Sequence, residues 1–321
     1  MSHIERTRKV SVPTKQSYYK KKNIFYYFKR DFLLYMLCVP IVVYYVIFKY
    51  IPMYGITIAF KNYNIFTGIS GSSWVGFDVF KKVFGEQFFW NSVRNTIVLN
   101  LLTLLSSFPL TIILALMLNE ARKVTFRRIS QSMLYLPHFV SWVVVAGLVE
   151  NLFSVRGGSI NNLVNKFGFE TIPFLIENSW WVFTYVISHI WKDIGWGTII
   201  YLAALSGVDE ALYESAYIDG ATKLQRIWNI TLPCIRPTIA IMFILSISRM
   251  LSIGLDAPLL LQNSKVIDVS EVISTYVYKM GLQRVQYSFA TAVGLFQSII
   301  NIILLLSANA MTKMMGEEGV L

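Results

Sequence analysis

Charged residues are scarce in this sequence. Only 15% of its 321 residues are charged, whereas 55% are hydrophobic and the mean hydropathy is +0.53. A soluble globular domain carries about 25% charged residues, so this chain has more apolar side chains than one soluble core can bury. The composition therefore excludes an ordinary soluble domain and favours a protein that is surrounded partly by lipid.

Cysteine and histidine are also rare. The two cysteines, Cys38 and Cys234, are far apart and form no C-x-x-C pair, and the histidines His3, His138 and His189 are scattered. These spacings indicate neither a disulfide framework nor a metal site. The sequence also lacks the H-E-x-x-H, G-x-S-x-G and Walker phosphate-loop motifs. We therefore predict no catalytic residue, no metal and no cofactor bound by this chain.

Positive charge is concentrated at the N-terminus. The net charge is +11, and nine basic residues occupy the first thirty positions, opposed only by Glu5. The other basic residues lie mostly in short stretches between apolar runs, which is typical of a membrane protein oriented by cytoplasmic positive charge. This distribution argues against nucleic acid as a partner and predicts a lipid bilayer.

Six apolar stretches are long enough to cross a membrane, since a helix of about 20 residues spans a hydrocarbon core of about 30 Å. We therefore predict an all-α integral membrane fold with about six transmembrane helices, divided into a basic tail (1–30), a first helix with its outer connection (31–92), a transmembrane core (93–312) and a C-terminal tail (313–321). The predicted spans are 32–48, 96–118, 133–153, 180–205, 232–255 and 289–311.

The loop charges predict the orientation of these spans in the cell membrane. The connection between the second and third spans carries four basic residues against Glu120, so it is expected in the cytoplasm. The connection after the third span is balanced in charge and is expected outside. With six spans, both termini then lie in the cytoplasm.

The connection between the fourth and fifth spans, residues 207–233, has the signals of two short helices separated by a break. Asp209 is a candidate N-cap, Gly220 interrupts the first helix, and Thr222 with Gln225 forms a potential capping box. Pro233 is expected in the opening turn of the fifth span, where its missing donor costs least. The small residues of the first helix predict either a helix that inserts into a groove on a partner protein or an ordinary amphipathic helix at the membrane surface.

The same segment resembles the signature of binding-protein-dependent transport permeases, which reads Glu-Ala-Ala, three residues, Gly, nine residues, Ile-x-Leu-Pro. The one departure is Ser215 in place of the middle alanine, and serine is also small. The residues that match in type and spacing are Glu214, Ala216, Gly220, Ile230, Leu232 and Pro233.

The resemblance implies a subunit of an ATP-binding-cassette importer, itself without catalytic activity. Its partners would be a second permease subunit, a cytoplasmic ATPase dimer that uses ATP and Mg, and an external solute-binding protein. The signature loop would insert into the ATPase as a coupling helix. The residues assigned to this coupling are Glu214, Ser215, Ala216, Asp219, Gly220, Ile230, Leu232 and Pro233.

Two further stretches, 48–55 and 135–143, resemble a narrower group, the permeases for complex oligosaccharides and polysaccharide fragments. This second resemblance implies that the protein imports oligosaccharides, including oligosaccharides that contain uronic acids.

Four of the polar residues within predicted spans are candidates for the substrate pathway, since each charge costs on the order of 2.5–3.5 kcal/mol at mid-helix. His189, Lys192 and Asp193 lie in the fourth span and either line the substrate pathway or pair with the partner subunit. Arg249, late in the fifth span, either meets the carboxylate of an acidic sugar or extends to the membrane interface.

Two other functions remain open from the residues alone. A stand-alone ion-coupled transporter would use Asp193 as its buried carboxylate, although no inverted repeat is visible. A purely structural membrane anchor would purify without an ATPase.

Overall fold

The computed structural model describes residues 30–121 and 123–314. The chain divides into two units, Met1–Gly55 and Ile56–Leu321. The boundaries of the two predicted tails, after residues 30 and 312, lie next to residues outside the described part, so they stay predictions. The predicted boundary at residue 92 is not tested either. The structure itself groups the outer connection from Ile56 onward with the core.

The first unit contains the first predicted span. α2 (Phe32–Tyr45) continues through a π-helical turn (Val46–Tyr50) into α3 (Ile51–Met53), and the helical run extends to Phe60, 29 residues in all. This run is long and apolar enough to cross a membrane. The predicted helix is therefore confirmed, and it continues beyond the predicted end.

Three helices of the second unit also satisfy the length and hydropathy of a membrane span. The fifth predicted span begins earlier and ends earlier than expected, because a continuous helix runs from Lys223 to Ser248 and the chain leaves it before Leu255. The three are α6 (Gln87–Asn119), the continuous run of α12 (Lys223–Arg226) and α13 (Leu232–Ser248), and α17 (Tyr287–Met314).

The third predicted span is broken rather than straight. α7 (Val124–Tyr135) and a 3-10 turn (Leu136–Phe139) form one arm, α8 (Trp142–Phe153) forms the other, and the two arms meet at 101°. Pro137 opens the 3-10 turn, Val140 is extended, and Ser141 then caps α8 by accepting a hydrogen bond from Val144 N. The expectation of one continuous helix over 133–153 was therefore wrong.

The fourth predicted span forms α10 (Asn178–Ser206), a helix of 29 residues. It is long enough to cross a membrane, but it carries Lys192 and Asp193 and is not one of the four helices in the described chain that are also apolar enough. The prediction of six spans is thus not confirmed, since the broken pair raises the number of apolar candidates only to five.

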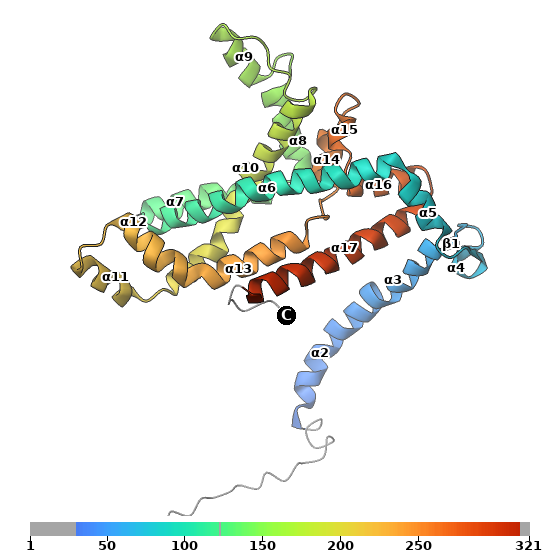
Figure 1. The fold of residues 1–321 in the computed structure, drawn as a ribbon, viewed down its shortest axis with the longest axis horizontal. Coiled ribbons are helices and arrows are strands. Elements are labelled where there is room, and N and C mark those ends of the chain that lie inside the picture. The colour runs from blue at the N-terminus through green and yellow to red at the C-terminus, as the bar shows by residue number, and fades with distance from the viewer. Residues whose placement is uncertain (1–29, 122, 315–321) are drawn as a thin grey trace, which may run out of the picture. The chain divides into compact units, whose positions relative to one another are not determined.

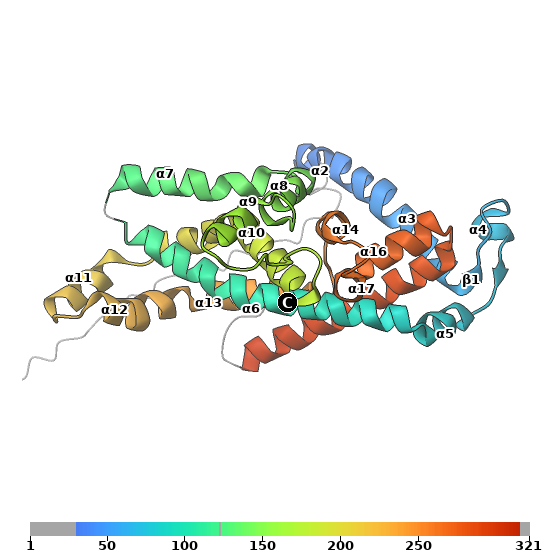
Figure 2. The ribbon, with the colours of Figure 1, turned by 90° about the horizontal axis from the view of Figure 1, so that it is seen from above.

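α10 is the helix around which the core of the second unit is assembled (Figures 1 and 2). It packs against α6, α7 and α13, while α13 packs against α17. A Cβ added at Gly195 would lie 2.0 Å from the Leu134 carbonyl oxygen, so α7 crosses α10 with its backbone in contact. Such close approach requires glycine.

Short elements cover one end of these helices and share a core with them. This core buries Phe80, Phe89, Leu251 and Ile273 between α5, α6, α16 and α17. At this end lie β1 (Lys61–Asn62), antiparallel to β2 (Ser73–Trp74), with α4 (Gly68–Gly71), α5 (Asp78–Gly85), α16 (Ile273–Tyr278) and a π-helical turn (Lys279–Gln283). Elsewhere, α9 (Ser159–Lys166) and α14 (Asp256–Leu261) pack on α8, and α15 (Ile267–Ser270) packs on α6 and α10.

Candidate coupling loop and intramembrane polar track

The loop after α10 folds as its local signals predict. Asp209 caps α11 (Glu210–Ile218), because its Oδ1 accepts a hydrogen bond of 3.0 Å from Ala211 N. Glu210 in the first turn is favourable for the helix dipole. The predicted cap and first short helix are confirmed.

Gly220 ends α11 in a left-handed conformation, with φ of +76°. Ala221 N donates to Ala216 O at 2.9 Å and Gly220 N donates to Tyr217 O at 3.1 Å, which is the hydrogen-bond pattern of a Schellman motif. The signature glycine therefore has a local reason, since other residues strain at positive φ.

The second arm of the loop is tied to the first and to α6. Thr222 and Gln225 form the predicted capping box, with Gln225 Oε1 accepting from Thr222 N at 2.8 Å. Tyr213 and Thr231 share a hydrogen bond of 2.9 Å between their hydroxyls, and Lys223 Nζ lies 3.4 Å from Glu120 Oε2 at the end of α6. The loop is thus a closed unit attached to the long helix beside it.

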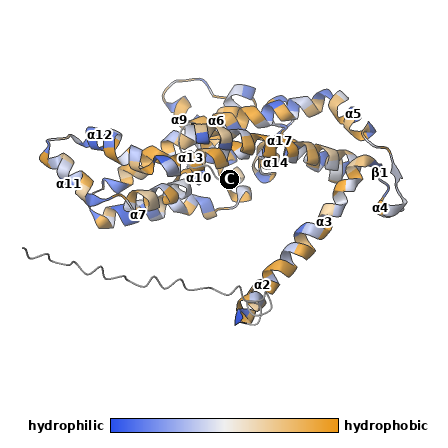
Figure 3. Cartoon of the chain, turned by 60° about the horizontal axis from the view of Figure 1, so that its bottom comes forward, coloured by the Kyte–Doolittle hydropathy of each residue, from blue (hydrophilic) through white to orange (hydrophobic). Residues whose placement is uncertain are grey.

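The signature residues divide into a displayed set and an anchoring set. Ile230 and Leu232 are half-buried, and Leu232 packs on the core formed by Tyr201, Leu205 and Ile235. Ala216 is half-buried as well. Glu214, Ser215, Asp219 and Gly220 are exposed, beside exposed apolar side chains at Tyr217 and Ile218. Figure 3 shows hydrophilic residues along α11 and α12.

Pro233 lies in the first turn of α13, as predicted. The feature that was not predicted is the connection before it, because α12 leads without a gap into α13 through a π-helical turn, Ile227–Thr231. Leu232 N bonds to Ile227 O, one residue further back than in an α-helix, immediately before the proline. A wider turn here accommodates the ring that would otherwise clash with the preceding turn.

Two small cavities form a polar track between α6, α10 and α13. The first, of about 190 Å³, is lined by His189 and Asp193. The second, of about 180 Å³, is lined by Asn100 and Arg249. The cavities are contiguous because they share Thr103, Leu104, Ser107 and Ser246. The structure therefore brings three of the four predicted intramembrane residues to one track.

Asp193 is paired inside the chain. His138 Nδ1 lies 2.8 Å from Asp193 Oδ1, and His189 Nδ1 lies 4.0 Å from Oδ2 of the same carboxylate. The His138 ring stacks on Trp196 at 4.5 Å between centroids. His189 Nε2 is buried at the track and has no hydrogen-bond partner within the described residues.

Lys192 lies apart from the track and has a role that neither of the predicted alternatives included. Its Nζ donates to the backbone carbonyls of Pro137, His138 and Val140 at 3.3, 2.6 and 2.8 Å. These are the last carbonyls of the α7 arm, where a cation is favoured by the helix dipole. Lys192 therefore caps the break in the third predicted span.

Comparisons with known proteins identify the family. Residues 107–316 match the family of binding-protein-dependent transport system inner membrane components. The chain is 46% identical over 291 residues to Protein LplB of Bacillus subtilis, covering 91% of this chain and 92% of that protein. The chain belongs to this permease family. The membership sets aside the stand-alone transporter, because transport by this family depends on a binding protein.

Two further comparisons concern sugar transporters. The permease is 44% identical, over 94% of each chain, to the polygalacturonan/rhamnogalacturonan transport system permease YteP of Bacillus subtilis. It also superposes with a TM-score of 0.86 and 39% identity on a chain of a bacterial alginate transporter crystallised with an alginate pentasaccharide-bound periplasmic protein, covering 93% of this chain and 100% of that one. The predicted all-α importer fold and the resemblance to sugar permeases are confirmed.

Sequence reasoning missed the α6 side of the track. Four polar residues recur at helical spacing in this otherwise apolar helix, and each lines at least one of the two cavities: Asn100, Thr103, Ser107 and Thr111. That polar stripe was a signal available in the sequence of the permease. The pairing of His138 with Asp193 had no such signal, because 55 residues separate them.

Proposed function

We propose that this permease forms, with a second permease subunit, the membrane channel of an ATP-driven importer for oligosaccharides that contain uronic acids. The observation that carries the proposal is the closed signature loop on a chain of this family. An external solute-binding protein delivers the cargo and a separate ATPase dimer supplies the energy. The chain itself holds neither ATP nor Mg.

The displayed set of the signature loop is the surface that meets the ATPase. Glu214 offers a carboxylate for a cation of the ATPase, and the exposed Tyr217 and Ile218 offer apolar surface beside it. The contacts from Tyr213 to Thr231 and from Lys223 to Glu120 hold the loop as one body. A displacement of the loop is thereby passed on to α6 and α13.

The polar track is our candidate for this subunit's side of the sugar pathway. Arg249 is exposed and makes no ion pair with the described residues, so its guanidinium is available to a sugar carboxylate. Asp193 would repel such a cargo, but its pairing with His138 reduces that repulsion. The polygalacturonan and alginate transporters among the similar proteins agree with an acidic cargo.

The loop charges give the orientation in the cell membrane. The signature loop and the Arg127–Arg128 segment face the cytoplasm in this arrangement, together with both termini. The α9 segment and the α14–α16 segment face outward, where a solute-binding protein docks.

The proposal is tested by isolating the assembled complex. The chain is tagged, purified in mild detergent from its native host, and its partners are identified by mass spectrometry. We expect an ATPase, a second permease and a solute-binding protein. Gly220→Pro and Glu214→Lys should lose the ATPase while still inserting in the membrane, whereas Glu170→Lys, at an exposed position in the opposite loop, should keep it. ATPase retained at wild-type levels in both loop variants would contradict the proposal.

A further inference from the structure

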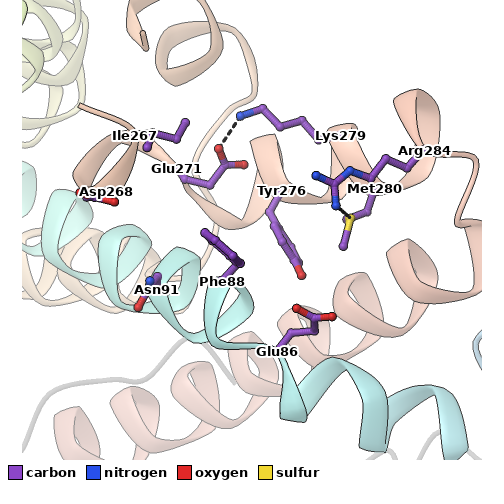
Figure 4. Close-up of a pocket in the computed structure, with 10 residues that line it drawn as sticks. All are labelled: Glu86, Phe88, Asn91, Ile267, Asp268, Glu271, Tyr276, Lys279, Met280 and Arg284. Carbon is purple, nitrogen blue, oxygen red and sulfur yellow. Dashed lines mark hydrogen bonds and ion pairs between the residues drawn. The ribbon is translucent and has the colours of Figure 1, made fainter. Parts of the chain in front are cut away.

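A cavity of about 330 Å³ lies at the N-terminal end of α6, outside the track, and the buried Tyr276 hydroxyl at its wall has no partner within the described residues. Figure 4 shows Glu86 and Phe88 on the α6 side and Tyr276, Lys279 and Arg284 on the segment that leads to α17. In the orientation proposed above, this cavity opens on the outer face. Its volume falls in the range of roughly 300–1,000 Å³ that is usual for small-molecule sites.

One buried polar group at this cavity has no partner within the described chain, and two exposed charged groups, Glu86 and Arg284, lie beside it without an ion pair. Tyr276 is only 5% exposed, and its hydroxyl has no hydrogen-bond partner there. The Glu86 carboxylate likewise has no hydrogen bond to a described residue, and Arg284 Nη1 contacts only the Met280 sulfur, at 3.5 Å. A buried hydroxyl without a partner is costly, so a ligand that supplies one is favoured.

The groups at this cavity include both hydrogen-bond donors and acceptors and both signs of charge, so a ligand must itself be able to donate and to accept hydrogen bonds. Tyr276 stays protonated as a donor, since burial and then the nearby Glu86 carboxylate raise its pKa to about 12. Glu271 and Lys279 satisfy each other as an ion pair. The free groups are therefore a carboxylate that accepts, a hydroxyl that donates and accepts, and a guanidinium that donates.

A sugar ring matches this set better than a simple ion does. Arg284 disfavours a cation, while Glu86 disfavours a small anion. Neighbouring sugar hydroxyls can donate to the carboxylate and pair with the tyrosine, and a uronate group can meet the guanidinium. Phe88 is 68% exposed at the cavity and presents an apolar face to the ring.

We propose that this cavity is an outer subsite for one pyranose ring of the oligosaccharide cargo, contacted by Glu86, Phe88, Tyr276 and Arg284. The subsite is separate from the track between α6, α10 and α13, and it rests on the proposed function for the nature of the cargo. A cargo of several rings would occupy the subsite with one ring before another reaches Arg249.

The test measures sugar binding to the assembled complex in nanodiscs, without the solute-binding protein. Saturation-transfer NMR follows a galacturonate trisaccharide and, separately, a neutral galactose trisaccharide. Tyr276→Phe removes only the hydroxyl and should weaken binding of both sugars about fivefold to tenfold. Tyr278→Phe on the same helix, whose side chain does not line the cavity, is the matched control and should bind as wild type. Arg284→Gln should weaken the acidic sugar more than the neutral one.

Equal binding by Tyr276→Phe and Tyr278→Phe would overturn the subsite. Weakened docking of the solute-binding protein to Tyr276→Phe, with sugar binding unchanged, would also overturn it and assign the cavity to that protein. If Arg249→Gln weakens sugar binding and Tyr276→Phe does not, the subsite fails while the proposed function stands. A wild-type complex that binds neither sugar would overturn the subsite together with the proposed cargo.

Discussion

A charge within a membrane helix costs on the order of 2.5–3.5 kcal/mol, and Lys192 shows how the chain offsets that cost. The ammonium is buried, donates to the carbonyls of Pro137, His138 and Val140 at the bend, and lies 5.9 Å from the Trp142 ring centroid. Pro137 O also accepts from Val140 N, so the lysine is the additional partner of one carbonyl and the side-chain donor to the other two. The bend and the lysine depend on each other.

Replacing Lys192 should therefore destabilise the bend more than removal of a surface charge would. Lys192→Met keeps the length of the side chain but removes the side-chain donor to these carbonyls, at a cost of about 1–3 kcal/mol. We expect a lower midpoint of thermal unfolding in detergent, measured by size-exclusion recovery after heating. Lys166→Met, at an exposed position, should leave the midpoint unchanged. Equal midpoints for the two variants would remove the capping role.

Arg249 gives a prediction about selectivity. Its removal leaves a uronate without the guanidinium partner, while a neutral sugar loses less, so Arg249→Gln should reduce uptake of acidic oligosaccharides by about tenfold more than neutral ones. Uptake of labelled oligosaccharides by intact cells is the measurement. Arg128→Gln, at an exposed position of α7 that lines neither cavity, should affect neither cargo. Equal losses for both cargoes in Arg249→Gln would instead indicate an interfacial role.

At the scale of elements, local signals were sufficient for the coupling loop. Asp209, Gly220 and the Thr222–Gln225 pair act on neighbours within six residues, so their caps and breaks could be predicted from the sequence. The bend at 140 could not, because its partner Lys192 is supplied from α10, 52 residues away. The π-helical turn before Pro233 was missed because a proline is compatible with either a helix start or a distorted continuation.

The crossing of α7 and α10 provides a prediction at the same scale. Gly195→Ala would place its Cβ 2.0 Å from the backbone oxygen of Leu134, so the helices must separate. We expect loss of folded protein or a markedly lower thermal midpoint. Gly147→Ala in α8 meets nothing within 4 Å and should be neutral or slightly stabilising, because alanine favours a helix. A Gly195→Ala variant as stable as Gly147→Ala would show that the crossing can relax.

For the whole molecule, the proposed function requires the coupling loop and the α9 loop on opposite sides of the membrane. Ile218 and Phe167 are 84% and 78% exposed, so each is open to a reagent on its own side. In a background with Cys38→Ser and Cys234→Ser, an impermeant maleimide added to intact cells should label Phe167→Cys and not Ile218→Cys. Permeabilised cells should allow both. Labelling of Ile218→Cys in intact cells would reverse the proposed orientation.

α6 is one continuous helix of 33 residues, about 50 Å long at 1.5 Å per residue. One end carries Glu120, held by Lys223 of the signature loop, and residues at the other end line the outer cavity. Pro109, about two thirds of the way from Gln87 to Asn119, removes one backbone hydrogen bond and is the natural point of bending. If the signature loop binds an ATPase as proposed, a displacement of the loop would be transmitted along this one helix to the cavity at its other end.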